Sequence, residues 1–200
     1  MALEVMNLAE TSSKSESLVV TIGHSNRTIE EFIALLWTNE VAEVIDVRTI
    51  PCSRHNPQFN LDALPASLPA SLAAAGIEYS HWEGLGGLRH AHANSPNMAW
   101  HNASFRGYAD YMQSAEFAYS VDDIVKLAAS RRCALMCAEA VPWRCHRSLI
   151  SDALLVRGVR VEDIIGPHGR KAHAMTSFAH VEGLAVTYPA AVPVPKGANP

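Results

Sequence analysis

The sequence predicts a single three-layer α/β domain, in which a mostly parallel sheet of about five strands is flanked by helices. Two observations support this fold class. Short apolar segments alternate along the chain with segments of helical periodicity, and such alternation is typical of parallel strands joined by crossover helices. Residues 133–138 are apolar throughout, as expected for a strand that is covered on both faces.

The expected elements begin at residue 18. A strand over residues 18–22 ends at Gly23, and a helix over residues 28–37 follows it. Thr28 and Glu31 have the spacing of a capping box, which marks the start of that helix. Further strands are expected over residues 41–47, 77–82, 133–138 and 159–165. Further helices are expected over residues 61–75, where Pro65 and Pro69 interrupt the helix, over residues 107–130, as one or two helices, and over residues 144–156. A long loop is expected over residues 83–104.

Length and composition fit one globular domain. The chain has 200 residues, of which 48% are hydrophobic, and four are cysteines. We expect a flexible leader over residues 1–17, the domain over residues 18–189 and a loose Pro-rich tail over residues 190–200. Four cysteines are too few for a disulfide scaffold, no apolar run is long enough to span a membrane, and the start lacks a signal-peptide pattern. A cytoplasmic protein with reduced thiols and no membrane partner is therefore expected.

Charge is distributed unevenly along the chain. The formal net charge is −4, yet residues 1–126 carry 7 basic and 15 acidic residues, whereas residues 127–200 carry 9 basic and 5 acidic residues. Arg outnumbers Lys, which reflects either genomic base composition or the use of Arg for recognition of planar anions. The basic C-terminal part leaves open a nucleic-acid-binding module, although the overall acidity counts against it.

Reactive and charged side chains follow the predicted strands, whose own residues are apolar. In parallel α/β sheets the ligand crevice lies beyond the carboxyl ends of the strands, so these side chains are expected to share one site. The loop over residues 83–104 and the residues after it are expected to cover this site. The candidate residues before the fourth strand are His24, Ser25, Asp46, Arg48, Ser53, Arg54 and Arg106.

The segment after the fourth strand is the most specific. Pro142 suits the first turn of a helix, and a helix over residues 144–156 places Cys145 and His146 one turn before its apolar face. Free backbone N–H groups at the helix start, together with Arg144 and Arg147, predict an anion site. The same environment is expected to lower the pKa of the Cys137 thiol and make it a nucleophile.

The other groups near Cys137 leave several roles open. His146 is placed to act as an acid or a base. Glu139 and Asp46 are the carboxylate partners expected for it, or for Arg48 and Arg147, and His24 is a further catalytic candidate. Cys145 is expected to be a small buried hydrophobic residue. An alternative is a metal site formed by Cys137, Cys145 and His146, with His24 nearby, or a redox pair of the two cysteines.

Seven short motifs recur together in a known family. They are Thr21-Ile22-Gly23-His24-Ser25, Asp46-Val47-Arg48, Asn56-Pro57-Gln58-Phe59, Gly84-Leu85-Gly86-Gly87, Phe105-Arg106-Gly107-Tyr108, Cys137-Ala138-Glu139 and Cys145-His146-Arg147. With these motifs the chain resembles, over about residues 18–189, the family of bacterial domains of unknown function numbered 488. The resemblance implies a compact bacterial α/β domain and the location of the site, and it supplies no substrate.

From these observations we expect an enzyme that binds an anionic, phosphate-bearing or nucleotide-like small molecule. The arginines would hold the anion, and Cys137 or His146 would act as nucleophile or acid and base. A metal-binding or thiol redox protein is the first alternative, and a nucleic-acid-binding module is the second. The sequence identifies no cofactor and leaves the oligomeric state open.

Overall fold

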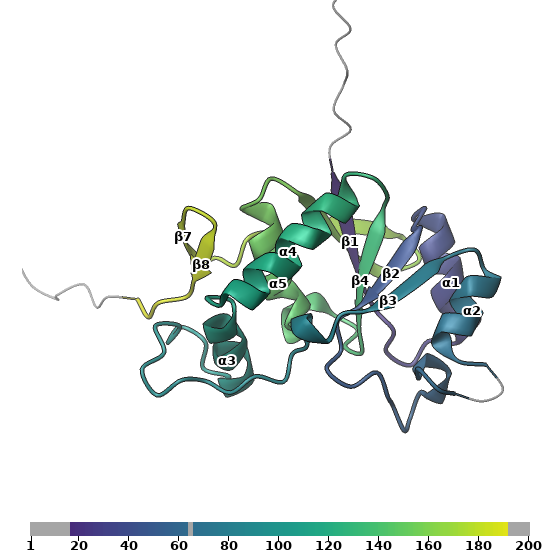
Figure 1. The fold of residues 1–200 in the computed structure, drawn as a ribbon, viewed down its shortest axis with the longest axis horizontal. Coiled ribbons are helices and arrows are strands. Elements are labelled where there is room, and N and C mark those ends of the chain that lie inside the picture. Colours follow the sequence, from purple (N-terminus) through teal and green to yellow (C-terminus); the bar gives the residue numbers. More distant parts are fainter. Residues whose placement is uncertain (1–16, 64–65, 192–200) are drawn as a thin grey trace, which may run out of the picture.

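The computed structural model describes residues 17–63 and 66–191, and these residues form the predicted α/β domain. Six strands make one sheet in the order β3-β2-β4-β1-β5-β6 (Figure 1). Strands β1 to β5 pair in parallel, and β6 joins the edge of the sheet antiparallel to β5. The bounds are β1 Leu18–Gly23, β2 Glu43–Asp46, β3 Glu78–His81, β4 Cys133–Cys137, β5 Arg160–Gly166 and β6 Gly169–Ala172.

Five α-helices and a small second sheet complete the described part of the chain. The helices are α1 Ile29–Thr38, α2 Leu68–Ala74, α3 Ala103–Tyr111, α4 Ala115–Ala128 and α5 Arg147–Leu155, with 3₁₀ turns at Pro57–Phe59, Glu83–Leu85 and Pro142–Arg144. β7 (His180–Glu182) and β8 (Ala185–Thr187) form an antiparallel pair. Among the described residues, no helix is long and apolar enough to cross a membrane.

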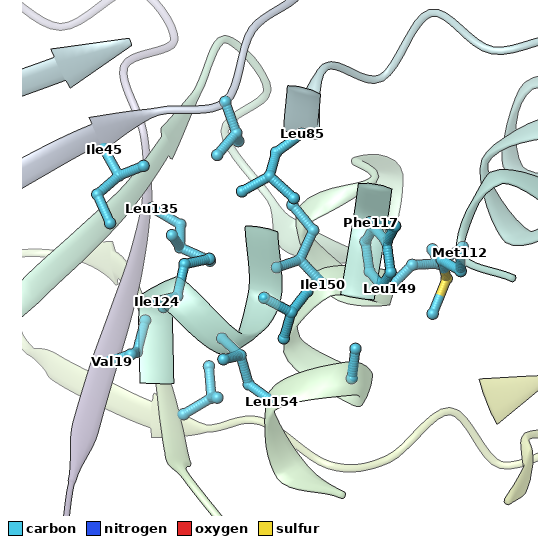
Figure 2. Close-up of a cluster of buried hydrophobic side chains, with 14 of the residues drawn as sticks. Val19, Ile45, Leu85, Met112, Phe117, Ile124, Leu135, Leu149, Ile150 and Leu154 are labelled. Carbon is cyan, nitrogen blue, oxygen red and sulfur yellow. The ribbon is translucent and has the colours of Figure 1, made fainter. Parts of the chain in front are cut away.

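Alternate residues of β1 and β4 face opposite layers, and every residue of these two strands is buried. Val19 and Leu135 belong to a cluster with residues of α3, α4 and α5 (Figure 2). Val20 and Met136 belong to a second cluster with residues of α1 and α2. The sheet is therefore the middle of three layers, and the predicted fold class is confirmed.

Local signals account for most helix boundaries. Thr28 caps α1, and the reciprocal bonds of the capping box with Glu31 are both present. The predicted 107–130 segment is two helices, because the Ser114 hydroxyl accepts a hydrogen bond from the N–H of Phe117 and starts α4 there. The helix predicted over residues 61–75 is shorter in the structure: Ser67 caps α2, and Pro69 occupies its first turn, where no N–H is needed.

The helix predicted over residues 144–156 is wrong at its start. Pro142 begins a separate 3₁₀ turn that the Cys145 N–H closes on the Pro142 carbonyl oxygen, at 2.9 Å. Cys145 is extended, with φ −135° and ψ 144°, and α5 begins only at Arg147. Cys145 and His146 therefore stand in the connection before the helix, and Arg144 does not lie in its first turn.

Three of the predicted segments fall largely or partly outside the described residues. Residues 1–16 of the predicted leader and residues 192–200 of the predicted tail are not described, nor is Pro65 in the predicted second helix. The strands β6, β7 and β8 were not predicted, and they follow the last predicted strand.

The uneven charge of the chain is explained by ion pairs between its two parts. Arg131 pairs with Glu78, Arg132 with Glu40, and Arg157 with Asp122. In each pair a basic residue of the C-terminal part meets an acidic residue of the N-terminal part. The positive charges of residues 127–200 are thus partly neutralised within the fold.

Candidate active site

A cavity of about 460 Å³ opens beside the carboxyl ends of β1 and β4. Thr49 and Ile50 after β2, Leu88 after β3 and Phe105 of α3 also line it. This is the place predicted for a ligand in a parallel α/β sheet. Of the predicted site residues, the cavity is lined by His24, Arg48, Ser53, Cys137, Glu139, Arg144, Cys145 and His146.

Two cysteines and a histidine meet at this cavity. The Cys145 Sγ atom lies 3.6 Å from His146 Nδ1, and the Arg147 Nε–H donates to the same sulfur at 3.4 Å. The Cys137 sulfur lies within 4.8 Å of the Cys145 sulfur. An imidazole and a guanidinium therefore contact one sulfur atom, which favours its thiolate form.

The two thiols have opposite pKa shifts. Burial alone would raise the pKa of Cys145, but the neighbouring thiol of Cys137, the imidazole of His146 and the charge of Arg147 lower it well below its usual value. The pKa of Cys137 is raised well above its usual value, because the neighbouring Cys145 favours its protonated form and because it is buried. Of the two thiols, Cys145 is therefore the one whose surroundings favour a thiolate, whereas the sequence predicted a lowered pKa for Cys137.

His146 is held in one orientation. Its Nε2–H donates to the Val47 carbonyl oxygen at 2.9 Å, which leaves Nδ1 facing Cys145. A Cβ atom at Gly87 would overlap with the imidazole at Nδ1, so a glycine is needed where this loop crosses the ring. The Gly-rich segment after β3 thus makes room for the histidine.

Arg147 is fully buried, with 0% of its surface exposed, and lies behind the thiol. Its Nη1 donates to Thr21 Oγ1 at 3.2 Å and its Nη2 to the Glu139 carbonyl oxygen at 2.6 Å. The Thr21 hydroxyl in turn donates to Asp163 Oδ1 at 2.7 Å. A continuous chain of hydrogen bonds therefore links a carboxylate on β5 to the Cys145 sulfur.

Arg48 is committed to a buried ion pair. Its guanidinium binds both carboxylate oxygens of Asp46 at 2.5–3.1 Å and donates to the Phe59 carbonyl oxygen at 2.8 Å. The Tyr79 hydroxyl donates to the same carboxylate at 2.8 Å. Asp46 is therefore the carboxylate partner of Arg48, one of the two alternatives expected for it, and His146 bonds to the Val47 carbonyl oxygen instead.

His24 supports Arg48 from the other side. Its Nδ1–H donates to the Ser25 carbonyl oxygen at 2.9 Å, its Nε2 faces Arg48 Nη1 at 3.4 Å, and its ring stacks on Phe59. Burial lowers the pKa of His24 to about 4. A neutral imidazole with both nitrogens engaged is better suited to hold Arg48 than to transfer protons.

The arginines predicted to form one cluster lie in different places in the structure. Arg144 is exposed on the cavity wall, and the exposed side chain of Glu139 lies on the same wall. Arg147 is buried behind the cysteines, while Arg54 is exposed and Arg106 contacts Met98, and neither lines the cavity. Ser25 has φ 50° in the turn after β1, where its N–H bonds to the Ala138 carbonyl oxygen.

The same centre could hold a metal ion. Cys137, Cys145 and His146 each offer one ligand atom, and these atoms lie within 4.8 Å of one another. Two sulfurs and one imidazole nitrogen form a ligand set that zinc accepts, with a fourth position toward the cavity. His24, the fourth residue of the sequence-based metal hypothesis, does not belong to this group.

From the sequence, Cys145 is expected to be a buried hydrophobic residue or, as the alternative, a metal ligand or redox partner of Cys137. The contact of its sulfur with Arg147 is not predicted, because a helix is expected over residues 144–156. The signal was the run Cys145-His146-Arg147, in which a thiol, an imidazole and a guanidinium are adjacent. Thr21 and Asp163 were missed as well, since each is one polar residue inside a strand and their contact joins positions 142 residues apart.

A family model described as "Domain of unknown function DUF488" matches residues 28–154. The chain belongs to this family. The matched residues run from the cap of α1 into α5, so they include Arg48, Cys137, Cys145 and His146. The match is shorter than the resemblance inferred from the motifs, and it leaves out Thr21 and Asp163. Searches of curated proteins and of solved structures found no match to this chain.

Proposed function

We propose that this protein is a cysteine-dependent enzyme that acts on a small molecule with an anionic group. Cys145 is the nucleophile, His146 is its acid and base, and Arg144 binds the anion. The proposal is supported above all by one observation, the position of the Cys145 sulfur between His146 Nδ1 at 3.6 Å and Arg147 Nε at 3.4 Å. A thiol with a neighbouring imidazole and a buried cation is an activated nucleophile.

The anionic group of the substrate is inferred from the charges of the cavity. Arg48 is neutralised by Asp46, and Arg147 is occupied by the thiolate, so Arg144 is the lining arginine best placed to meet a ligand. Ile50, Leu88 and Phe105 add an apolar rim. We expect a ligand with one anionic end and a less polar remainder.

The ion pairs described above favour this proposal over a nucleic-acid-binding surface. Arg131, Arg132 and Arg157 each meet an acidic residue of the same chain. Much of the excess positive charge of residues 127–200 is therefore neutralised by ion pairs within the domain. Binding of a nucleic-acid phosphate backbone would need unpaired cations along one face.

Alkylation of the thiols tests the proposal without knowledge of the substrate. We expect iodoacetamide to modify Cys145 at pH 7 at least about tenfold faster than an ordinary thiol, which is only a few per cent thiolate at that pH. Peptide mapping identifies the modified cysteine, and Cys145→Ser should remove the fast phase. Cys133 serves as the internal control, because burial raises its pKa to about 12 and it should not react.

The charge of the reagent tests the anion-binding part. Iodoacetate carries a carboxylate, so Arg144 should favour it over iodoacetamide, and Arg144→Gln should lower the ratio of the two rates about fivefold. Arg54→Gln removes a charge that does not line the cavity and should change the ratio little. Fast alkylation at Cys137 instead of Cys145, or one bound equivalent of zinc in the purified protein, would contradict the proposal.

A further inference from the structure

Two cysteines line the cavity side by side, and a nucleophile alone requires only one of them. The sulfur atoms of Cys137 and Cys145 lie within 4.8 Å of each other. Both sulfurs also lie within 4.8 Å of a ring nitrogen of His146. The second thiol therefore stands where it can attack any atom bonded to the first.

The backbone holds this pair in place from two directions. Cys137 is the last residue of β4, paired in register with Gly23 of β1. Cys145 is extended between the 3₁₀ turn and α5, and its sulfur is fixed by Arg147. The two residues are only eight positions apart in the sequence, so closing a ring between them costs little chain entropy.

The two thiols also differ in the way that thiol–disulfide exchange requires. Arg147 and His146 contact the Cys145 sulfur and stabilise it as a thiolate, whereas Cys137, within 4.8 Å of that sulfur, lies at the end of β4. An exchange pair works when one thiolate attacks and a second, protonated thiol lies beside it to resolve the mixed disulfide.

We propose that the cavity carries out thiol–disulfide exchange with the disulfide of a small anionic thiol, in which Cys145 attacks and Cys137 resolves. This inference rests on the proposed function, since it uses the same Cys145 thiolate and the same anion contact at Arg144. It specifies the substrate as a disulfide that bears carboxylate groups.

The chemistry balances without a further oxidant. The Cys145 thiolate attacks one substrate sulfur, a bond forms between these two sulfurs, the substrate S–S bond breaks, and one half leaves as a thiol with the proton from His146 Nδ1. Cys137 then gives its proton to the deprotonated Nδ1 and attacks the Cys145 sulfur. The Cys137–Cys145 bond forms, the second half leaves, and the proton passes to a departing thiolate. Two electrons move from the protein cysteines to the substrate disulfide.

Oxidised glutathione is the probe that tests this step. Reduced full-length protein should lose two hydrogens by mass spectrometry, and peptide mapping should locate a Cys137–Cys145 disulfide. Cys137→Ser should stop at a stable mixed disulfide on Cys145, and Cys145→Ser should form neither product. Cys133→Ser is the matched control, because that thiol lies in the hydrophobic core, and it should behave like the unchanged protein.

The preference for an anionic substrate is measured against bis(2-hydroxyethyl) disulfide, which carries no charge. Oxidised glutathione should react several-fold faster than this neutral probe, and Arg144→Gln should remove the difference. A Cys145 that is alkylated rapidly but forms no disulfide would overturn this inference alone, whereas a slowly alkylated Cys145 would overturn the proposed function. A mixed disulfide that forms first on Cys137, or accumulates in the unchanged protein, would also overturn the exchange mechanism.

Discussion

At the scale of single residues, the site depends on one buried guanidinium. Arg147 is fully buried, and its contacts reach the thiol, the carbonyl after β4 and the hydroxyl of Thr21. A buried cation needs compensation, and Asp163 supplies a carboxylate one hydrogen bond further on, through Thr21. Thr21 is therefore a positioning residue whose effect on the thiol is indirect.

The variant Thr21→Val tests this role. It keeps the shape of the side chain on β1 but leaves Arg147 Nη1 and Asp163 Oδ1 without their shared partner. Unsatisfied buried groups cost about 1–3 kcal/mol, so the free energy of unfolding in urea should fall by that amount. The rate of Cys145 alkylation should also fall, and its pH profile should move to higher pH.

A matched variant separates positioning from general loss of stability. Thr187→Val makes the same chemical change on β8, in the small second sheet, and should leave the alkylation profile in place. If Thr21→Val lowers stability but leaves the alkylation profile unchanged, Thr21 has only a structural role.

The residues of the site could be predicted in part. His24, Arg48, Cys137 and His146 were expected at strand ends, and they do line one cavity. The Asp46–Arg48 pair is one of the two partnerships expected for Asp46. The Thr21–Asp163 bond was not predictable, because it depends on side-chain directions that strand order alone does not fix. Arg147 was expected to face an anion and is instead enclosed by the sheet.

At the scale of elements, the site is shaped by the contact between the end of β1 and the loop after β4. A Cβ atom at Gly23 would overlap with the backbone carbonyl of Glu139, the group that accepts from Arg147 Nη2. The N–H of His24 also bonds to the Cys137 carbonyl oxygen at 2.9 Å. Backbone atoms cannot move aside as a flexible side chain can, so this position requires glycine.

We expect Gly23→Ala to lower the free energy of unfolding by about 1–3 kcal/mol, the usual cost of overpacking. Because the displaced carbonyl holds Arg147, alkylation of Cys145 should slow as well. Gly166→Ala is the control, since a Cβ atom there meets no neighbour within 4 Å. Equal urea midpoints for the two variants would contradict the tight contact inferred at Gly23.

The elements themselves were largely predictable, since apolar runs and caps have local causes. The exception with most consequence is the start of α5. The sequence pattern predicts that Pro142 lies in the first turn of the helix. In the structure Cys145 is extended, and this conformation directs its sulfur toward Arg147 and the cavity. That conformation arises from tertiary packing, and the sequence pattern, which continues through Leu149 and Ile150, does not reveal it.

At the scale of the whole molecule, two buried histidines link stability to pH in opposite directions. Burial lowers the pKa of His24 to about 4. Burial would also lower that of His173, but hydrogen bonds and charges of Asp152 and Asp163 raise it to about 9. His24 lines the cavity and His173 contacts Asp152 and Asp163, so each histidine is tested by its own substitution.

The signs follow from proton binding in the folded and unfolded states. Between pH 4 and pH 6.5 the unfolded chain binds a proton at His24 that the folded chain does not bind, so stability falls as the pH falls through this window. Between pH 6.5 and pH 9 the folded chain keeps a proton at His173 that the unfolded chain has lost, so stability falls as the pH rises. Each shift corresponds to at most about 3 kcal/mol at the end of its window.

We therefore expect the contribution of these two histidines to stability to be greatest near pH 6.5, and urea unfolding at pH 5, 6.5 and 9 measures it. His24→Gln should flatten the acid side of the profile, and His173→Gln the alkaline side, relative to the unchanged protein. The slopes of the free energy of unfolding against pH are compared, and not its absolute values, because carboxylates also titrate on the acid side. Either substitution also lowers the free energy of unfolding at every pH. The exposed His168→Gln variant should leave both slopes unchanged. An alkaline slope that persists in His173→Gln would show that the Asp152–His173–Asp163 cluster is not charged in the folded protein.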